Sequence, residues 1–126
     1  MLNLTTVMVG SEDPKDLRDF YTEVLGEPAW DDGGFVGWQA GSGMLMIGQH
    51  SEVKGRNEMP GRIILNFETP DVAAEFERIK GVGAPVVQDP YQPSAEQPNF
   101  WLPTFEDPDG NYFQLASPMP APGTDS

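Results

Sequence analysis

The spacing of apolar and polar residues divides the chain into strands and helices. The mostly apolar residues 2–9 favour a strand, and the period then changes to that of a helix over residues 13–25. Asp13 is a candidate N-cap, Pro14 suits the first helical position, and Gly26 is placed to follow the last one. The apolar stripe of this helix consists of Leu17, Phe20, Tyr21, Val24 and Leu25.

Short apolar segments follow this helix, and glycines separate them as turns. They predict three strands, at residues 28–30, 35–40 and 43–49. Residues 51–61 are polar and end in Pro60 and Gly61, which is typical of a linker.

The second half of the chain repeats the pattern. Residues 62–68 predict a strand and residues 70–80 a helix, with Thr69 as its N-cap and Pro70 at its first position. Gly81 is expected to end this helix. Further strands are predicted at residues 85–88, 100–106 and 111–117.

The two halves therefore form an internal repeat, in which Phe20 and Phe76 occupy matching helical positions. Each half runs strand, helix and then three strands. We expect an α+β fold with two βαβββ units, at about residues 2–50 and 61–118 of a single domain covering 1–119. The helices would cover the outer face of a curved mixed sheet, leaving a cleft on the other face. Residues 120–126 are expected to be a flexible tail.

The segment "DPDG" at residues 107–110 has two interpretations. Pro108, Asp109 and Gly110 suit the successive positions of a tight turn between two strands. A calcium loop would instead require glycine at its sixth position and glutamate at its twelfth, and the residue twelfth from Asp107 is Pro118. The turn is therefore the favoured interpretation.

Composition narrows the classes of function. The chain has 126 residues, no cysteine and a formal net charge of -13, with 20 acidic against 7 basic residues. The absence of cysteine excludes disulfides and thiolate zinc sites and fits the cytoplasm. We expect a chain this acidic to repel nucleic acid and anionic membranes and to tolerate or attract a cationic small molecule. The alternative, which general experience favours, is that the charge serves solubility alone. No apolar segment approaches the length of a membrane span, and the first ten residues lack the features of a signal peptide.

Three segments resemble one family. "DPKDLRDFYTEVLGEP" resembles the first-helix signature of the vicinal oxygen chelate superfamily, which includes glyoxalase I, extradiol dioxygenases, and fosfomycin and bleomycin resistance proteins. "RIILNFETPDVAAEFERIKGVGAPVV" resembles its second strand and helix, and "FEDPDGNYFQLASP" its closing hairpin. The resemblance covers most of residues 2–118 and implies the fold more strongly than the activity, because one fold hosts many functions.

The resemblance also implies where a metal would bind. In metal-binding relatives the last strand carries a glutamate ligand, and the matching residue here is Gln114. The other ligand positions match Ile64 in the second half and either Leu4 or Thr6 in the first. Leucine and isoleucine cannot bind a metal, and a neutral amide is a poor ligand for a divalent cation. We therefore expect no metal and no other cofactor.

Strand alternation predicts which side chains face the cleft. If Phe67 packs under a helix, its neighbours in the sequence face the other way. Trp38, Met44 and Met46 are further candidates for the cleft, although the sequence does not show which face of the sheet they occupy. The predicted cleft residues are Thr6, Met8, Trp38, Ile64, Asn66, Glu68, Tyr112 and Gln114. This mixture of apolar and polar groups suits a small-molecule pocket, although the same side chains could simply fill the cleft or a dimer core.

His50 is the only histidine, and Glu52 follows it by two residues. In an extended segment the two side chains would face one way and could act as a base with its orienting carboxylate. An exposed histidine at the end of a strand is the alternative that the sequence favours.

Three functions remain open. The favoured one is a metal-independent protein of this superfamily that binds, and thereby sequesters, a partly aromatic, neutral or cationic organic molecule, as a homodimer. The second is a lyase, isomerase or dioxygenase whose metal is held by unusual ligands such as His50, Glu52, Glu68 and Gln114. The third is a protein-interaction module. No catalytic residue is assigned.

Overall fold

The computed structural model describes residues 1–118, so the expected tail at 120–126 lies outside the described residues. The chain divides into two compact units. The first contains residues 1–58 together with 108–110, and the second contains residues 59–107 together with the chain from Asn111. The boundary at residues 58 and 59 falls within the segment that the sequence predicted to be a linker.

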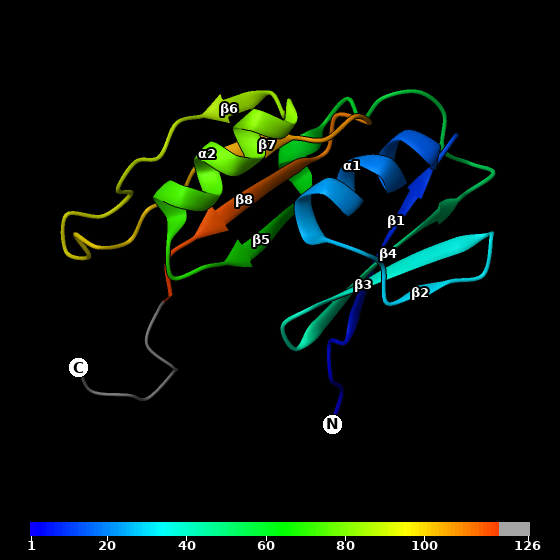
Figure 1. Ribbon diagram of the computed structural model, residues 1–126, viewed down its shortest axis with the longest axis horizontal. Coiled ribbons are helices and arrows are strands. Elements are labelled where there is room, and N and C mark those ends of the chain that lie inside the picture. The colour runs from blue at the N-terminus through cyan, green and yellow to red at the C-terminus, as the bar shows by residue number, and fades with distance from the viewer. Residues whose placement is uncertain (119–126) are drawn as a thin grey trace. The chain divides into compact units, whose positions relative to one another are not determined.

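The first unit is a four-stranded sheet with one helix. Its elements are β1 (Thr6–Ser11), α1 (Lys15–Leu25), β2 (Trp30–Asp31), β3 (Phe35–Ala40) and β4 (Gly43–Gln49). The strand order is β1-β4-β3-β2, with β1 parallel to β4 and the other pairs antiparallel. The helix α1 lies over one face of this sheet (Figure 1).

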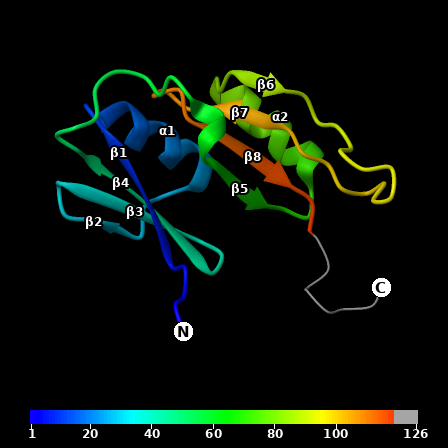
Figure 2. The same ribbon diagram turned by 180° about the vertical axis from the view of Figure 1, so that it is seen from behind.

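The second unit repeats this arrangement. It contains a 3-10 helix η1 (Pro60–Arg62), followed by β5 (Ile64–Glu68), α2 (Val72–Val82), β6 (Val86–Gln88), β7 (Thr104–Glu106) and β8 (Tyr112–Ala116). The strand order is β5-β8-β7-β6, and β5 and β8 run parallel, side by side in both views (Figure 1 and Figure 2). The prediction of two βαβββ units in an α+β fold is confirmed. The strands form two four-stranded sheets, one in each unit, where the sequence analysis expected one curved sheet.

Both helices begin later than the sequence predicted. Asp71 is the N-cap of α2, because its carboxylate accepts a hydrogen bond of 3.0 Å from the backbone N–H of Ala74. The predicted cap, Thr69, accepts instead from the N–H of Asp71, so Pro70 precedes the helix. The end of α2 also differs, because Gly83 rather than Gly81 adopts the left-handed conformation that closes it.

Each core lies between the helix and the sheet of its own unit. In the first unit the Tyr21 and Trp38 rings lie 6.2 Å apart between centroids, and the indole N–H of Trp38 donates to the carbonyl of Gly26 at 2.9 Å. In the second unit Phe105 stacks on Phe113 at 5.4 Å, and Phe76 of α2 lies 5.2 Å from Phe105. These contacts place each helix against one face of the sheet of its own unit, and the other face is called the open face below.

The "DPDG" segment forms the predicted turn between β7 and β8. The buried carboxylate of Asp107 accepts hydrogen bonds from the backbone and side chain of Asn111, and Gly110 has a φ of 82°. Only glycine adopts this backbone conformation without strain. Asp107 thus serves the turn itself.

Candidate functional site

The open face of the second sheet carries a row of polar side chains. Phe105, Phe113 and Leu115 are buried on the side of α2, so the residues that alternate with them face the other way. Strand register places Ile64 beside Tyr112 and Asn66 beside Gln114. The five predicted residues of this unit, Ile64, Asn66, Glu68, Tyr112 and Gln114, therefore share one face as strand alternation predicted.

A hydrogen bond orders the centre of this face. The side-chain amide nitrogen of Gln114 donates to the hydroxyl of Thr104 at 3.0 Å, and Thr104 pairs with Gln114 across β7 and β8. Sequence reasoning missed Thr104, although its position in a short strand beside the closing hairpin could have suggested it. Glu106 also belongs to this face, next to Tyr112.

The open face of the first sheet is apolar. Thr6 and Met8 of β1 lie beside Met44 and Met46 of β4, and Met46 lies beside Gly37 of β3. Met8 is 57% exposed. Methionine is flexible and polarisable, and such side chains adapt to ligands of different shape.

Glycines on this apolar face let neighbouring side chains approach the backbone closely. A Cβ atom added to Gly48 would lie only 2.2 Å from Cδ1 of Phe35, so the Phe35 ring rests directly against the glycine backbone. A Cβ atom on Gly37 would lie 3.4 Å from Cγ of Met46. Phe35 and Met46 therefore lie close to the glycine backbones of the neighbouring strands.

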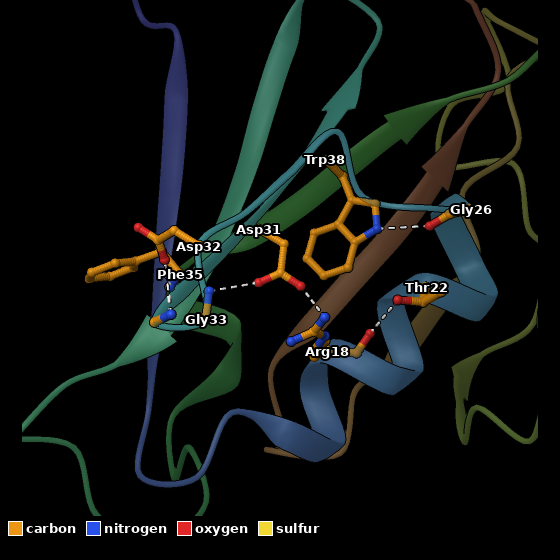
Figure 3. Close-up of polar contacts among 9 residues, drawn as sticks. Arg18, Thr22, Gly26, Asp31, Asp32, Gly33, Phe35 and Trp38 are labelled. Atoms are coloured by element: carbon orange, nitrogen blue, oxygen red, sulfur yellow. Dashed lines mark hydrogen bonds and ion pairs between the residues drawn. The ribbon is translucent and has the colours of Figure 1, made fainter.

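The hairpin between β2 and β3 fixes the backbone of Phe35, the first residue of β3. The carboxylate of Asp32 accepts hydrogen bonds from the backbone N–H groups of Gly34 and Phe35, at 2.9 and 2.8 Å (Figure 3). These two bonds lower the pKa of Asp32 below its usual value because they favour the charged form, and the bond from Phe35 has the larger effect. The carboxylate therefore stays ionised and holds the hairpin.

Trp38 corrects the sequence-based assignment. Its side chain is 1% exposed and lies on the α1 side of the sheet, where it contacts Tyr21 and Gly26. Because β3 alternates, its neighbours Gly37 and Gln39 face the open side instead. Trp38 is a core residue, and the sequence could not assign its face because it did not reveal which residues of β3 pack under the helix.

Leu4 precedes β1 and is 88% exposed, whereas Thr6 is the first residue of that strand. Neither offers the carboxylate or imidazole that a divalent cation prefers. Gln114, at the third position, offers only a neutral amide oxygen, which is a poor ligand for a divalent cation. Within residues 1–118 no group of three or more histidine, cysteine, aspartate or glutamate side chains is placed to hold a metal ion. The donor set does not fit the metal that some relatives carry.

His50 and Glu52 are not arranged as an acid–base pair. The segment forms a turn rather than the extended chain assumed from the sequence, since the N–H of Val53 donates to the carbonyl of His50. Nδ1 of His50 accepts a hydrogen bond of 3.1 Å from the backbone N–H of Glu52. In neutral His50 the proton therefore resides on Nε2. The contact involves the Glu52 backbone, so it does not orient the imidazole as a carboxylate would.

A family model described as a glyoxalase-like domain matches residues 6–116 of the chain. The chain belongs to the glyoxalase-like domain family. The family match and the solved structures support membership of the vicinal oxygen chelate superfamily, as the three sequence segments implied. No curated protein matches this glyoxalase-like domain.

Solved structures share the fold at low identity. A glyoxalase-related enzyme from Fulvimarina pelagi is 20% identical, with a TM-score of 0.74 over 98% of this chain and 96% of that one. A glyoxalase/bleomycin resistance protein/dioxygenase family enzyme from Burkholderia phytofirmans PsJN is 19% identical, with a TM-score of 0.73 over 94% and 100%. TioX from Micromonospora sp. ML1 is 19% identical, with a TM-score of 0.69 over 93% and 99%. At these identities the likeness establishes the fold of the glyoxalase-like domain.

Proposed function

We propose that this glyoxalase-like domain binds a small, partly aromatic, neutral or cationic molecule without a divalent metal. The observation that carries the proposal is the apolar face of the first sheet. Phe35 lies against Gly48, and Met8, Met44 and Met46 surround the neighbouring positions. Aromatic rings gain dispersion and apolar burial on such a surface, and sulfur–aromatic contacts add to both.

Charge supports the choice of ligand. The net charge of -13 favours a cationic molecule over an anionic one through the field of the whole chain. The donor set around Gln114 does not fit a metal, and sequestration needs none. A protein that binds and holds a compound requires no catalytic residue, and none is assigned here. We also propose that the partners exclude nucleic acid and anionic membranes, on the same electrostatic grounds. No helix within residues 1–118 is long and apolar enough to cross a membrane.

Three probes that share one ring system test this proposal. They are 9-(aminomethyl)anthracene, which is cationic, 9-anthracenemethanol, which is neutral, and 9-anthracenecarboxylate, which is anionic. Titration followed by tryptophan quenching should give saturable binding, tightest for the cation and weakest for the anion. Equal affinity for all three would refute the electrostatic part. The absence of saturable binding by any of them would refute the proposal.

We further propose that the domain is a homodimer. Leu2 and Leu4 are exposed ahead of β1, an edge strand of the first sheet, and β1 itself exposes Met8. Contiguous exposed apolar groups of this kind often mark a protein interface. Light scattering should give twice the 13.8 kDa chain mass, and a Leu4→Asp variant should shift this mass towards that of one chain. A single-chain mass for the unaltered protein across a wide concentration range would contradict the dimer.

A further inference from the structure

A pocket of about 200 Å³ lies in the first unit, away from the open face of its sheet. Its apolar part is formed by Val36 and Ile47, both buried on the α1 side. Its other walls come from the start of α1 and from the β2–β3 hairpin (Figure 3). The volume lies below the ~300–1,000 Å³ of pockets that hold drug-sized ligands, so the site suits a molecule of amino-acid size.

The charged groups around this pocket are balanced in sign. Two carboxylates, Asp13 and Asp31, and two cations, Lys15 and Arg18, line it. This lining carries no net charge, whereas the whole chain carries -13. A purely anionic or purely cationic ligand would meet one repulsive pair, whereas a zwitterion can place each of its charges beside the opposite one.

The pocket holds Arg18 in a position that leaves donors free. One guanidinium nitrogen of Arg18 forms an ion pair with Oδ2 of Asp31 (Figure 3). Oδ1 of Asp31 accepts from the N–H of Gly33 at 2.9 Å, which fixes this carboxylate to the hairpin. Among residues 1–118, Asp31 is the only acceptor that the guanidinium contacts, so its remaining N–H groups are available to a ligand carboxylate.

Lys15 and Asp13 complete the rim. The ammonium group of Lys15 donates to Asp19 at 2.9 Å, and this bond together with the charge of Asp19 raises the pKa of Lys15 above its usual value. Within residues 1–118, Asp13 accepts only a long bond of 3.3 Å, from the backbone N–H of Lys15. Its carboxylate can therefore receive a ligand ammonium group.

We propose that this pocket binds a small zwitterion of the aliphatic α-amino acid class. The ligand carboxylate pairs with Arg18, its ammonium group with Asp13 and Asp31, and its aliphatic side chain contacts Val36 and Ile47. Phe35 borders both this pocket and the aromatic surface of the proposed function. The charged groups of the pocket and its buried Val36 and Ile47 side chains do not belong to that surface, so the proposal does not depend on that function.

Three matched probes test the zwitterion requirement. L-Leucine carries both charges, 3-methylbutylamine only the ammonium group, and 4-methylpentanoate only the carboxylate. Titration of the isotope-labelled protein, followed by backbone amide NMR shifts, should show saturable changes with leucine at residues 13–18 and 31–36. Leucine should bind at least about tenfold more tightly than either analogue, as expected when one charge pair is lost.

Variants locate the site. Arg18→Met and Asp13→Asn should each weaken leucine binding about tenfold or more, and Asp13→Asn should leave the affinity for the anthracene probes unchanged. Arg78→Met is the control, because Arg78 pairs with Glu75 on α2 at a similar exposure, 43% and 37% against 44% and 27% for Arg18 and Asp31. Asp13 is exposed, so its variant folds even where the loss of Arg18 perturbs the hairpin. Shifts that do not saturate, that appear elsewhere, or that are equal for the three probes would overturn the proposal.

Discussion

The ring of Phe35 lies directly against the α-carbon of Gly48 in the neighbouring strand, at a position where any side chain would displace it. A Cβ atom at residue 48 would approach Cδ1 and Cε1 of Phe35 to 2.2 and 2.3 Å. Because residue 48 has no side chain, the Phe35 ring can lie close to the backbone on the apolar face of β3 and β4. The proposed aromatic ligand depends on this surface.

The substitution Gly48→Ala should move the Phe35 ring off the sheet. Because the ring is partly exposed it can rotate away, so we expect a loss of about 1 kcal/mol in the free energy of unfolding, at the low end for overpacking. Affinity for 9-(aminomethyl)anthracene should fall about tenfold, the equivalent of losing one aromatic contact. Gly61→Ala is the control, since a Cβ atom there meets nothing within 4 Å and its φ is not in the left-handed region. Unchanged binding in Gly48→Ala would show that the ligand lies elsewhere.

Trp38 should matter for stability and not for ligand binding. Trp38→Phe removes the indole N–H that donates to Gly26 and leaves a small cavity beside Tyr21, so unfolding should become easier by about 1–3 kcal/mol. Urea unfolding measures this change. Affinity for the anthracene probes should stay within about twofold, since a core residue makes no ligand contact. A large loss of affinity in a protein that remains folded would return Trp38 to the binding surface.

The first unit contains a partly buried hydrogen bond between distant parts of the sequence. Ser11, which is 1% exposed, donates from its hydroxyl to Oδ2 of Asp109 at 2.6 Å. Ser11→Ala should lower the free energy of unfolding by about 1.5–3 kcal/mol, the usual range for a bond to a charged group. Ser42→Ala, at an exposed position in a turn, should change it by less than about 0.5 kcal/mol. Similar unfolding midpoints in urea for the two variants would argue against this bond.

Stability at low pH should depend on Asp32. Its pKa is lower in the folded chain than in the unfolded one, because the N–H groups of Phe35 and Gly34 favour the carboxylate. The folded state therefore gains stability above the unfolded pKa and loses it as the pH falls through the lower, folded value. Titration of the Asp32 carboxyl by NMR, in the native chain and in urea, should show the lower midpoint in the native chain. Identical midpoints would contradict it, and Asp32→Asn should remove the effect.

The sequence predicted the architecture well because local patterns carry it. The stripe through Leu17 and Tyr21 predicted α1, and the glycines around residues 35–49 marked β3 and β4 at their observed bounds. Helix starts were less accurate, since Thr69 and Asp71 are both good capping residues and only the tertiary structure selects between them. Pairing partners such as Gln114 and Thr104 depend on strand register, which single-chain periodicity does not give.

Strand alternation predicted which side chains share a face of a strand, but it did not predict contacts between strands. Ile64, Asn66 and Glu68 share a face of β5, because they alternate with Phe67, which packs on the helix side. Phe35 and Gly48 were not singled out, because their contact joins two strands and involves an absent side chain. The pocket at Arg18 was also missed, since its walls come from α1 and from a hairpin more than ten residues away.

The central claim is that the glyoxalase-like domain binds an aromatic cation without a metal. Isothermal titration of 9-(aminomethyl)anthracene into protein dialysed against a chelator, and into the same protein supplied with zinc or manganese, tests it most directly. We predict one saturable binding isotherm with the same affinity in both samples. The side chains of Thr6, Ile64 and Gln114 do not suit a divalent cation. Binding that disappears after chelation and returns with the metal would contradict the account and favour a metal-dependent enzyme.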